Sequence, residues 1–200
     1  MTRVTYDRIA RLYDLLDLPF EHGRYRPLRK KLFASVQGRV LDAGCGTGRN
    51  FAYYPSHAEI IGIDLSPAML ARATKRRAKM GLALPLLEVD ICQTSFADGT
   101  FDFAVASFLF CVLPNDRQLA ALTEIKRVLK PGGEIRLLEY TWSKDPARLR
   151  IQKLWEPWVK WAYGAGFDRE THRFVQEAGF RDMEETFLYA DIIKLIRAKR

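Results

Sequence analysis

The chain of 200 residues is long enough for one domain with a substantial buried core, and its composition, 48% hydrophobic and 28% charged, is typical of a globular protein. It has no run of about 18 apolar residues that could cross a bilayer. Its first residues lack the hydrophobic core and cleavage site of a secretory signal, so we expect a cytoplasmic protein. Three cysteines without a CxxC pair argue against disulfides, and three scattered histidines argue against a metal site. The net charge of +8 favours contact with polyanions, either nucleic acid or an anionic membrane.

Residues 1–37 form the first segment, which begins with a predicted amphipathic helix. In YDRIARLYDLL, four apolar or aromatic residues recur on one helical face: Tyr6, Ile9, Tyr13 and Leu16. Such a face can pack on the core or cover a site. The basic run EHGRYRPLRKKLF then places five cations around Tyr25, namely Arg24, Arg26, Arg29, Lys30 and Lys31. A basic run is typical of a solvated face, but beside an amphipathic helix it can also bind phosphates at a membrane surface.

Residues 38–139 alternate short apolar runs with longer amphipathic ones, a pattern typical of a parallel sheet covered by helices. Strands are predicted at 39–44, 59–64, 84–90, 101–107 and 133–140. One helix is predicted from a cap at Ser66 to Gly81, and another from a cap at Asn115 to the PGG sequence at 131–133. Residues 166–200 are expected to add a helix near 168–179 and two strand-like runs within 183–200.

Polar groups follow three of these strands at the edge where a ligand of an open α/β sheet binds. The loop VLDAGCGTG has glycines at 44, 46 and 48, so backbone N–H groups can approach a ligand where the strand turns into a helix. Asp64 ends the second strand, where a carboxylate can accept both ribose hydroxyls, and Asp90 ends the third. Asp42 would repel a pyrophosphate but would favour the sulfonium and amino groups of S-adenosylmethionine.

The motifs VLDAGCGTG, GIDLS, EVDI and LKPGG, in this order and spacing, resemble class I S-adenosylmethionine-dependent methyltransferases. The resemblance implies one α/β, Rossmann-like domain over residues 1–200, with a seven-stranded, mostly parallel sheet, an antiparallel last strand and an N-terminal helical lid. It implies S-adenosyl-L-methionine as cofactor and S-adenosyl-L-homocysteine as product.

The same resemblance assigns parts of the cofactor to numbered residues. Its methionine part would meet Asp42, the loop from Gly44 through Cys45 and Gly46 to Gly48, and Ser107; its ribose, Asp64; and its adenine, Asp90, Ile91 and Met69. Asn50 and Leu65 are also expected among the cofactor-binding residues. Met69 is equally explained as ordinary core. Cys45 is interpreted as a small filler of the loop, because no general base lies near it in the sequence.

Residues 140–165 form an aromatic and basic insertion after the fifth predicted strand. In KLWEPWVKW, Trp155, Trp158 and Trp161 lie close together among lysines, within a run of helical spacing. A buried indole N–H needs a partner, whereas at a membrane interface one end of the ring stays wet. We therefore expect these tryptophans to contact an anionic membrane together with the N-terminal helix; core packing or pocket lining is the alternative.

The stretch DAGCGTGRNFxYYP and the ending IIKLIRAKR resemble bacterial phospholipid N-methyltransferases. This implies stepwise methylation of the phosphatidylethanolamine amine towards phosphatidylcholine, by a protein peripheral to the inner face of the cytoplasmic membrane. Tyr6, Tyr13, Tyr25 and Tyr140 would hold the methylated ammonium by cation–π attraction, while a tyrosine, Glu139 or water would accept the proton. Arg24 and Arg26 would bind the lipid phosphate.

Three other functions stay open. The pattern YDxIAxxYD is similar to ubiquinone and menaquinone C-methyltransferases, in which this segment covers the cofactor and the acceptor is a prenylated ring. The charge allows an RNA methyltransferase, but SFLFCVLP replaces the (N/D)PP(Y/F) loop of many amino-directed nucleic-acid enzymes, so nucleic acid is not the expected partner. The third is a membrane-associated module that binds S-adenosylmethionine without turnover.

Overall fold

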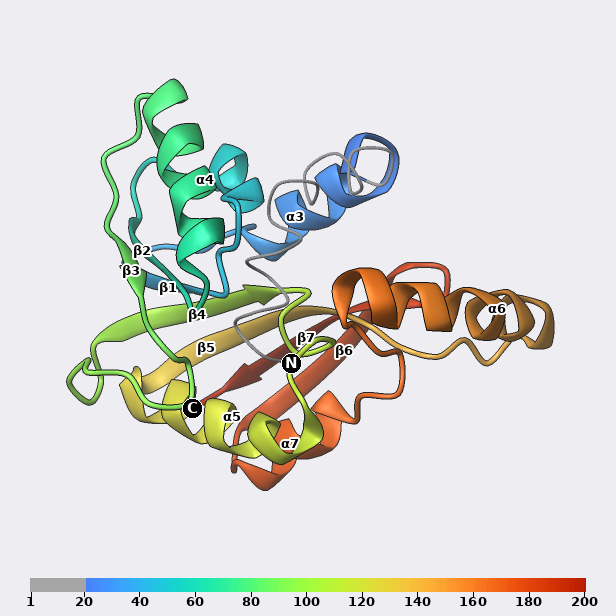
Figure 1. Ribbon diagram of the computed structural model, residues 1–200. Coiled ribbons are helices and arrows are strands. Elements are labelled where there is room, and N and C mark those ends of the chain that lie inside the picture. Colours follow the sequence, from blue (N-terminus) through green and yellow to red (C-terminus); the bar gives the residue numbers. More distant parts are fainter. Residues whose placement is uncertain (1–20) are drawn as a thin grey trace.

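A seven-stranded sheet forms the centre of the molecule, in the order β3-β2-β1-β4-β5-β7-β6 (Figure 1). The computed structural model describes residues 21–200. The strands are β1 (Arg39–Ala43), β2 (Glu59–Asp64), β3 (Leu86–Glu88), β4 (Phe101–Ser107), β5 (Leu129–Tyr140), β6 (Arg181–Tyr189) and β7 (Ile193–Lys199). The first five pair in parallel, whereas β7 is antiparallel to both β5 and β6. The predicted Rossmann-like sheet with an antiparallel last strand is therefore confirmed.

Helices cover both faces of the sheet (Figure 1). They are the π-helical turn η1 (Glu21–Tyr25), α3 (Arg26–Leu32), the 3-10 turn η2 (Arg49–Tyr53), α4 (Pro67–Lys79), α5 (Asn115–Val128), α6 (Pro146–Tyr163) and α7 (Thr171–Glu177). Helices α3 and α4 lie on one side of the sheet, and α5 and α7 lie on the other. None of the helices in residues 21–200 has the length and apolarity needed to span a membrane.

Neighbouring residues of the central strands enter different hydrophobic clusters, one on each face of the sheet. In β1, Val40 packs in the cluster that includes Leu28 of α3, and the next residue, Leu41, packs in the cluster that includes Leu122 of α5. Successive strand side chains point to opposite faces, and here both faces are covered. This explains why the sequence of these strands is continuously apolar rather than alternating.

The predicted start of α4 agrees with the structure, but the boundaries of several other elements differ. Strand β3 covers only Leu86–Glu88 rather than the predicted 84–90. Ser66 caps α4 by accepting a hydrogen bond from the Met69 amide at 3.2 Å. For α5 the N-cap is Pro114 and not the predicted Asn115, and no side chain caps the helix. The helix ends at Val128, before the predicted end at the PGG sequence. Strand β5 begins before the PGG sequence because Leu129 already pairs with Phe101 across a register shift.

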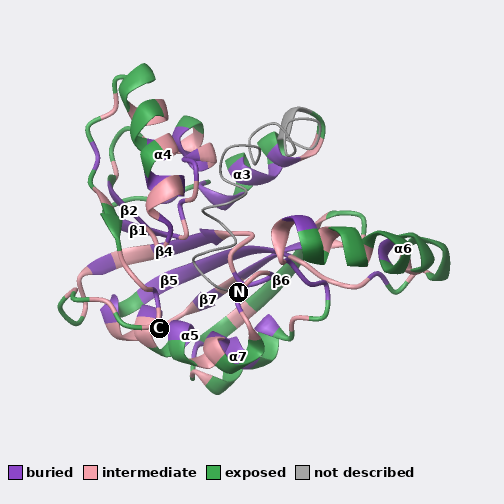
Figure 2. Cartoon of the chain, viewed as in Figure 1, coloured by how far each residue is buried: buried purple, intermediate pink, exposed green. Residues whose placement is uncertain are grey.

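The glycine-rich loop also differs from the prediction at its far end. After Gly48 the chain makes only the short turn η2 rather than a full helix, and Tyr54 is already extended. The predicted N-terminal lid, with Tyr6 and Tyr13, falls mostly on residues 1–20, which lie outside the described part of the chain. Within the described part, α6 extends away from the sheet, and most of its surface is exposed (Figures 1 and 2).

Candidate active site

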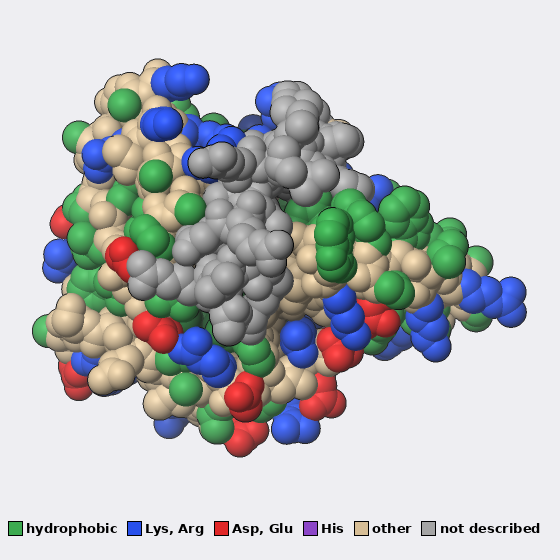
Figure 3. Space-filling view, in the orientation of Figure 1, with side chains coloured by type: hydrophobic (Ala, Val, Ile, Leu, Met, Phe, Trp, Pro, Cys, Tyr) green, Lys and Arg blue, Asp and Glu red, His purple; other side chains and the backbone are tan. Residues whose placement is uncertain are grey.

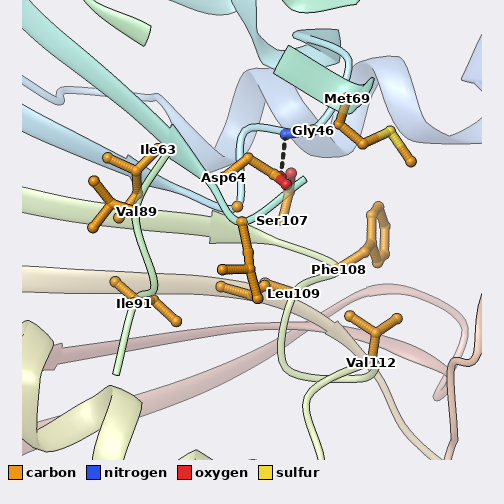
Figure 4. A pocket seen from close by; sticks show the side chains of 12 residues that line it. Gly46, Ile63, Asp64, Met69, Val89, Ile91, Ser107, Phe108, Leu109 and Val112 are labelled. Carbon is orange, nitrogen blue, oxygen red and sulfur yellow. Dashed lines mark hydrogen bonds between the residues drawn. The ribbon is translucent and has the colours of Figure 1, made fainter. Parts of the chain in front are cut away.

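A pocket lies at the carboxyl ends of β1, β2 and β4 (Figure 4). Its lining is mostly apolar, and Asp64 is the one ionisable side chain among the described residues that form it. The lining residues are Gly44, Gly46, Ile63, Asp64, Leu65, Met69, Val89, Ile91, Ser107, Phe108, Leu109 and Val112. This is the sheet edge at which the sequence predicted a binding site.

The glycine-rich loop passes one wall of this pocket. Gly44 has φ +69°, and a Cβ atom there would lie 2.8 Å from the Leu109 side chain, so a larger residue would be strained and would crowd Leu109. The Gly46 amide donates to Asp64 Oδ2 at 2.9 Å, the bond drawn in Figure 4. The Ser66 amide donates to Asp64 Oδ1 at 2.8 Å. Two backbone amides thus fix the Asp64 carboxylate at the pocket.

Two predicted loop residues, Cys45 and Gly48, do not line the pocket. The Cys45 side chain packs towards Gly62 of β2, where an added Cβ atom would lie 3.1 Å from its sulfur. Burial raises the pKa of this thiol well above its ordinary value, which agrees with a filler of the loop rather than a nucleophile. Gly48, at φ +80°, packs against Phe51 of η2.

Beneath the loop lies a fully buried carboxylate, Asp42. It accepts bonds from Asn50 Nδ2 at 3.1 and 3.0 Å and from the Tyr54 hydroxyl. Burial, opposed in part by these bonds and by the charge of Arg29, raises its pKa to about 6. The sequence led us to expect Asp42 and Asn50 to face the cofactor, but the structure puts both in the layer that supports the pocket wall.

Arg29 is a site residue that the sequence interpretation missed. It was counted among the surface cations, yet it is 4% exposed and donates to Asn50 Oδ1 at 2.7 Å and to Ser107 Oγ at 2.9 Å. The surface interpretation of this residue is therefore wrong. A signal was available, because the spacing of Tyr25, Leu28 and Leu32 puts position 29 on the buried face of the helix.

Asp90 turns away from the pocket, while its neighbour Ile91 lines it. The Asp90 carboxylate accepts from the Cys92 amide at 2.9 Å and pairs with Arg117 of α5 at 2.5 Å. Although partial burial opposes ionisation, these two donors hold the pKa of Asp90 below its ordinary value. Met69 is 2% exposed and also lines the pocket, so it belongs both to the core and to the site.

Aromatic rings collect beside the pocket where β4 and β5 end. Phe108, the residue after β4, has φ +56° and lies in the lining. Its ring centroid is 4.9 Å from that of Tyr25 and 5.1 Å from that of Tyr140, and the two tyrosine hydroxyls are hydrogen-bonded to each other. The row continues from Tyr140 to Phe167 at 5.5 Å and from Phe167 to Trp142 at 5.2 Å. Two predicted acceptor-site residues, 115 positions apart, are thereby brought together.

Glu139 is buried and faces the loop after β4. Its carboxylate accepts from the Phe110 amide at 2.9 Å and from the Cys111 amide at 2.8 Å. Burial raises its pKa to about 7, although these amide bonds oppose the shift. Glu139 is not a lining residue. Its geometry therefore supports a role in positioning this loop rather than the predicted role as a proton acceptor.

The remaining predicted residues lie on the surface around the site. The Arg24 guanidinium lies 4.1 Å from the ring centroid of Tyr189 in β6, and Arg26 is exposed on α3. Trp155, Trp158 and Trp161 are all exposed on α6. The structure thus rejects core packing and pocket lining as the explanation of these tryptophans.

Comparison with known proteins decides the family. A family model described as a methyltransferase domain matches residues 40–133. A phosphatidylethanolamine N-methyltransferase from Cereibacter sphaeroides is 38% identical over 142 residues, which cover 67% of this chain and 68% of that protein. The chain belongs to the S-adenosylmethionine-dependent methyltransferases.

A second relative of this methyltransferase differs in its named reaction. The ubiquinone/menaquinone biosynthesis C-methyltransferase of Syntrophotalea carbinolica is also 38% identical, over 154 residues that cover 72% of this chain and 63% of that protein. The chain thus spans about two thirds of the length of these two relatives. The two names differ in the methylated atom, so similarity alone leaves the acceptor undetermined.

Solved structures agree with the fold. A methyltransferase from Thermotoga maritima aligns with a TM-score of 0.75 over 99% of both chains at 20% identity. A geranyl diphosphate C-methyltransferase from Streptomyces coelicolor, solved with S-adenosyl-L-homocysteine, aligns with a TM-score of 0.71 over 87% of this chain and 75% of that chain at 14% identity. S-adenosylmethionine is the cofactor of this methyltransferase family, and the pocket fits it, with a glycine loop open to a ligand, a fixed carboxylate and apolar walls.

Proposed function

We propose that this methyltransferase methylates the amine of phosphatidylethanolamine and its mono- and dimethyl forms at a membrane surface. The observation that carries the proposal is the aromatic wall of Phe108, Tyr25 and Tyr140 beside the pocket. Aromatic rings attract alkylated ammonium groups, which keep their charge after each methyl transfer. The relative from Cereibacter sphaeroides, a phosphatidylethanolamine N-methyltransferase by name, supports the same acceptor.

The cofactor would be held along the carboxyl edge of the sheet. Asp64, fixed by two amides, would accept the ribose hydroxyls, and its neighbour Leu65 would pack beside them. The apolar side chains of Met69 and Ile91 would flank the adenine. The loop Gly44–Gly48 and Ser107 would meet the methionine part. Bound there, S-adenosylmethionine supplies an electrophilic methyl group on sulfur.

Catalysis by this chain would rest mainly on orientation. Holding donor and acceptor in line can lower a barrier by roughly 7–11 kcal/mol. The acceptor ammonium must first lose a proton, because only the neutral amine has a lone pair to attack the methyl carbon. The rings of Tyr25 and Tyr140 pack beside the pocket-lining Phe108, and their bonded hydroxyls would pass that proton to water.

The second candidate is C-methylation of a prenylated ring, which the similarity to the Syntrophotalea relative and the apolar pocket favour. A ring hydroxyl must lose its proton in that reaction. The Tyr25–Tyr140 hydroxyl pair could take that proton as well as the proton of an ammonium, so proton transfer does not separate the two substrates. The aromatic wall gives more support to an amine, because it attracts a cation more strongly than a neutral ring.

The test is to incubate the protein with methyl-labelled S-adenosylmethionine and vesicles of phosphatidylethanolamine and phosphatidylglycerol, and in parallel with a demethylated prenyl quinol. We expect label in the aminophospholipid. Label in the quinol alone supports the second candidate. If calorimetry shows that S-adenosylhomocysteine binds but neither acceptor is labelled, both proposals fail.

A pair of variants separates the ring from the hydroxyl of Tyr140. Tyr140→Leu should lower kcat/KM for phosphatidylethanolamine about ten-fold, the order expected from a lost cation–π contact, with unchanged S-adenosylhomocysteine affinity. Tyr140→Phe keeps the ring and should retain the KM while the pH dependence of kcat changes. Equal KM values for the leucine and phenylalanine variants would argue against an aromatic ammonium site.

A further inference from the structure

Helix α6 presents an apolar stripe to solvent. Its members and their exposed fractions are Ile151 (58%), Leu154 (79%), Trp155 (54%), Trp158 (37%) and Trp161 (80%). They follow the i, i+3, i+4, i+7 spacing that defines one helical face. Five of the nine exposed large hydrophobic side chains in the described residues belong to this one helix. Such clustering marks an interaction surface rather than chance exposure.

The helix is held by its N-terminal end and its inner side, and not along this stripe. Asp145 caps it by accepting from the Arg148 amide at 2.9 Å. Gln152, on the inner side, accepts from the Ser143 amide at 2.7 Å and donates to the Thr141 carbonyl at 3.0 Å. These bonds use the inner polar groups of α6, so the outward stripe is available to a partner while the helix keeps its orientation.

The charge around the stripe indicates what the partner is. Residues 144–163 contain five cations, Lys144, Arg148, Arg150, Lys153 and Lys160, against two carboxylates, Asp145 and Glu156. Lys and Arg side chains gather at the tip and lower side of α6, next to its hydrophobic groups (Figure 3). Tryptophan beside lysine and arginine is the composition of helices that lie in the interface of anionic membranes.

The chain segments before and after the helix also connect it to the pocket. Trp142 precedes α6 and Phe167 follows it, and their rings continue the aromatic row through Tyr140 to Phe108 in the pocket lining. The Gly166 amide donates to the Cys111 carbonyl in the loop after β4 at 2.8 Å. The docking surface and the acceptor side of the site are therefore parts of one connected structure.

We propose that α6 docks the protein on an anionic lipid surface, with its stripe among the headgroups and acyl-chain ends and its cations on lipid phosphates. The orientation of the pocket towards the lipid rests on the proposed function, whereas the docking itself does not. An amphipathic helix in this position would bring the acceptor to the pocket without a membrane-spanning segment.

The experiment measures docking in the absence of any acceptor. The protein is mixed with vesicles of phosphatidylcholine containing phosphatidylglycerol, and with vesicles of phosphatidylcholine alone, and bound protein is sedimented. We expect binding to the anionic vesicles that decreases with salt, together with a blue shift of tryptophan fluorescence. Leu154→Ser/Trp161→Ser should weaken this binding about 100-fold, because each buried apolar side chain contributes a factor of about ten.

A matched control is Met80→Ser/Leu87→Ser, which removes two exposed apolar side chains elsewhere on the surface. This control should bind vesicles like the unmodified protein, and both double variants should bind S-adenosylhomocysteine normally. No binding of the unmodified protein to anionic vesicles, or equal loss in both double variants, overturns the proposal. The proposal is also overturned if analytical ultracentrifugation shows that the unmodified protein is a dimer and that only the α6 double variant is a monomer, since a second copy would then cover the stripe.

The outcome for docking is separate from the outcome for the acceptor. Docking without labelling of phosphatidylethanolamine leaves this inference standing and refutes the proposed acceptor instead.

Discussion

Replacing Asp42 by Asn should make the stability of this methyltransferase less dependent on pH. Asp42 is fully buried beneath the glycine loop, and its folded-state pKa is about 6 against an ordinary value of 3.8. The carboxyl therefore binds its proton more tightly in the folded chain than in the unfolded chain. Its contribution to stability is complete below the unfolded pKa and is lost as the pH rises through the folded one.

The magnitude follows from the size of this shift. A difference of about two pKa units corresponds to about 3 kcal/mol, since each unit is worth about 1.4 kcal/mol. About 1 kcal/mol of this is already lost near pH 4.5, because the unfolded carboxyl ionises first. An amide at position 42 has no charge to bury, and it can still accept from Tyr54 and from Asn50 Nδ2. The hydrogen bond that it loses costs about 1 kcal/mol at every pH.

Urea unfolding of both proteins at about pH 4.5 and pH 8 checks the prediction. The free energy of unfolding of Asp42→Asn relative to the unmodified protein should rise by about 2 kcal/mol between the two pH values. The titration of Glu139 is common to both proteins and cancels in this comparison. A relative stability that stays constant between the two pH values would mean that Asp42 is not a buried ionisable group with a raised pKa.

Two further substitutions test the cofactor side of the site. Asp64→Ala should weaken S-adenosylhomocysteine binding about 100-fold in calorimetry, because two bonds to a charged acceptor are lost, and it should leave vesicle binding unchanged. Arg29→Met should lower the free energy of unfolding by about 3 kcal/mol, since it removes the donor to Asn50 and Ser107 and a cation near Asp42. Lys30→Met, on the exposed side of the same helix, should change it by less than about 0.5 kcal/mol.

The sheet and the pocket edge could be predicted because their determinants are local. Apolar runs of strand length, the Ser66 cap and the glycines of the loop each act within a few residues, and the right-handed parallel topology then brings the ends of consecutive strands together. Asp64 lies where this reasoning put it. Its amide partners, by contrast, depend on how the Gly44–Gly48 loop folds back over β2, which spacing does not specify.

The parts that were missed depend on tertiary contacts. Arg29 is indistinguishable from its basic neighbours in composition, and only its position on the inner helix face, opposite Asn50 and Ser107, makes it a buried donor. Phe108 adopts a positive φ although it is neither glycine nor asparagine, so the sequence does not indicate this conformation. The surrounding bonds hold the backbone in the left-handed region. Asp90 was predicted to end the third strand, but β3 ends at Glu88, and Arg117 of α5 engages the Asp90 carboxylate.

The loop after β4 contacts both β5 and the segment that follows α6. Its backbone is held from one side by the buried carboxylate of Glu139 in β5 and from the other by the amide of Gly166, two residues beyond the end cap of α6. The same loop supplies Phe108 and Leu109 to the pocket. Because interiors are close-packed, a force on α6 reaches this loop through a bond and a row of rings rather than through flexible chain. If α6 docks on lipid, its position would therefore directly affect the pocket wall formed by Phe108 and Leu109.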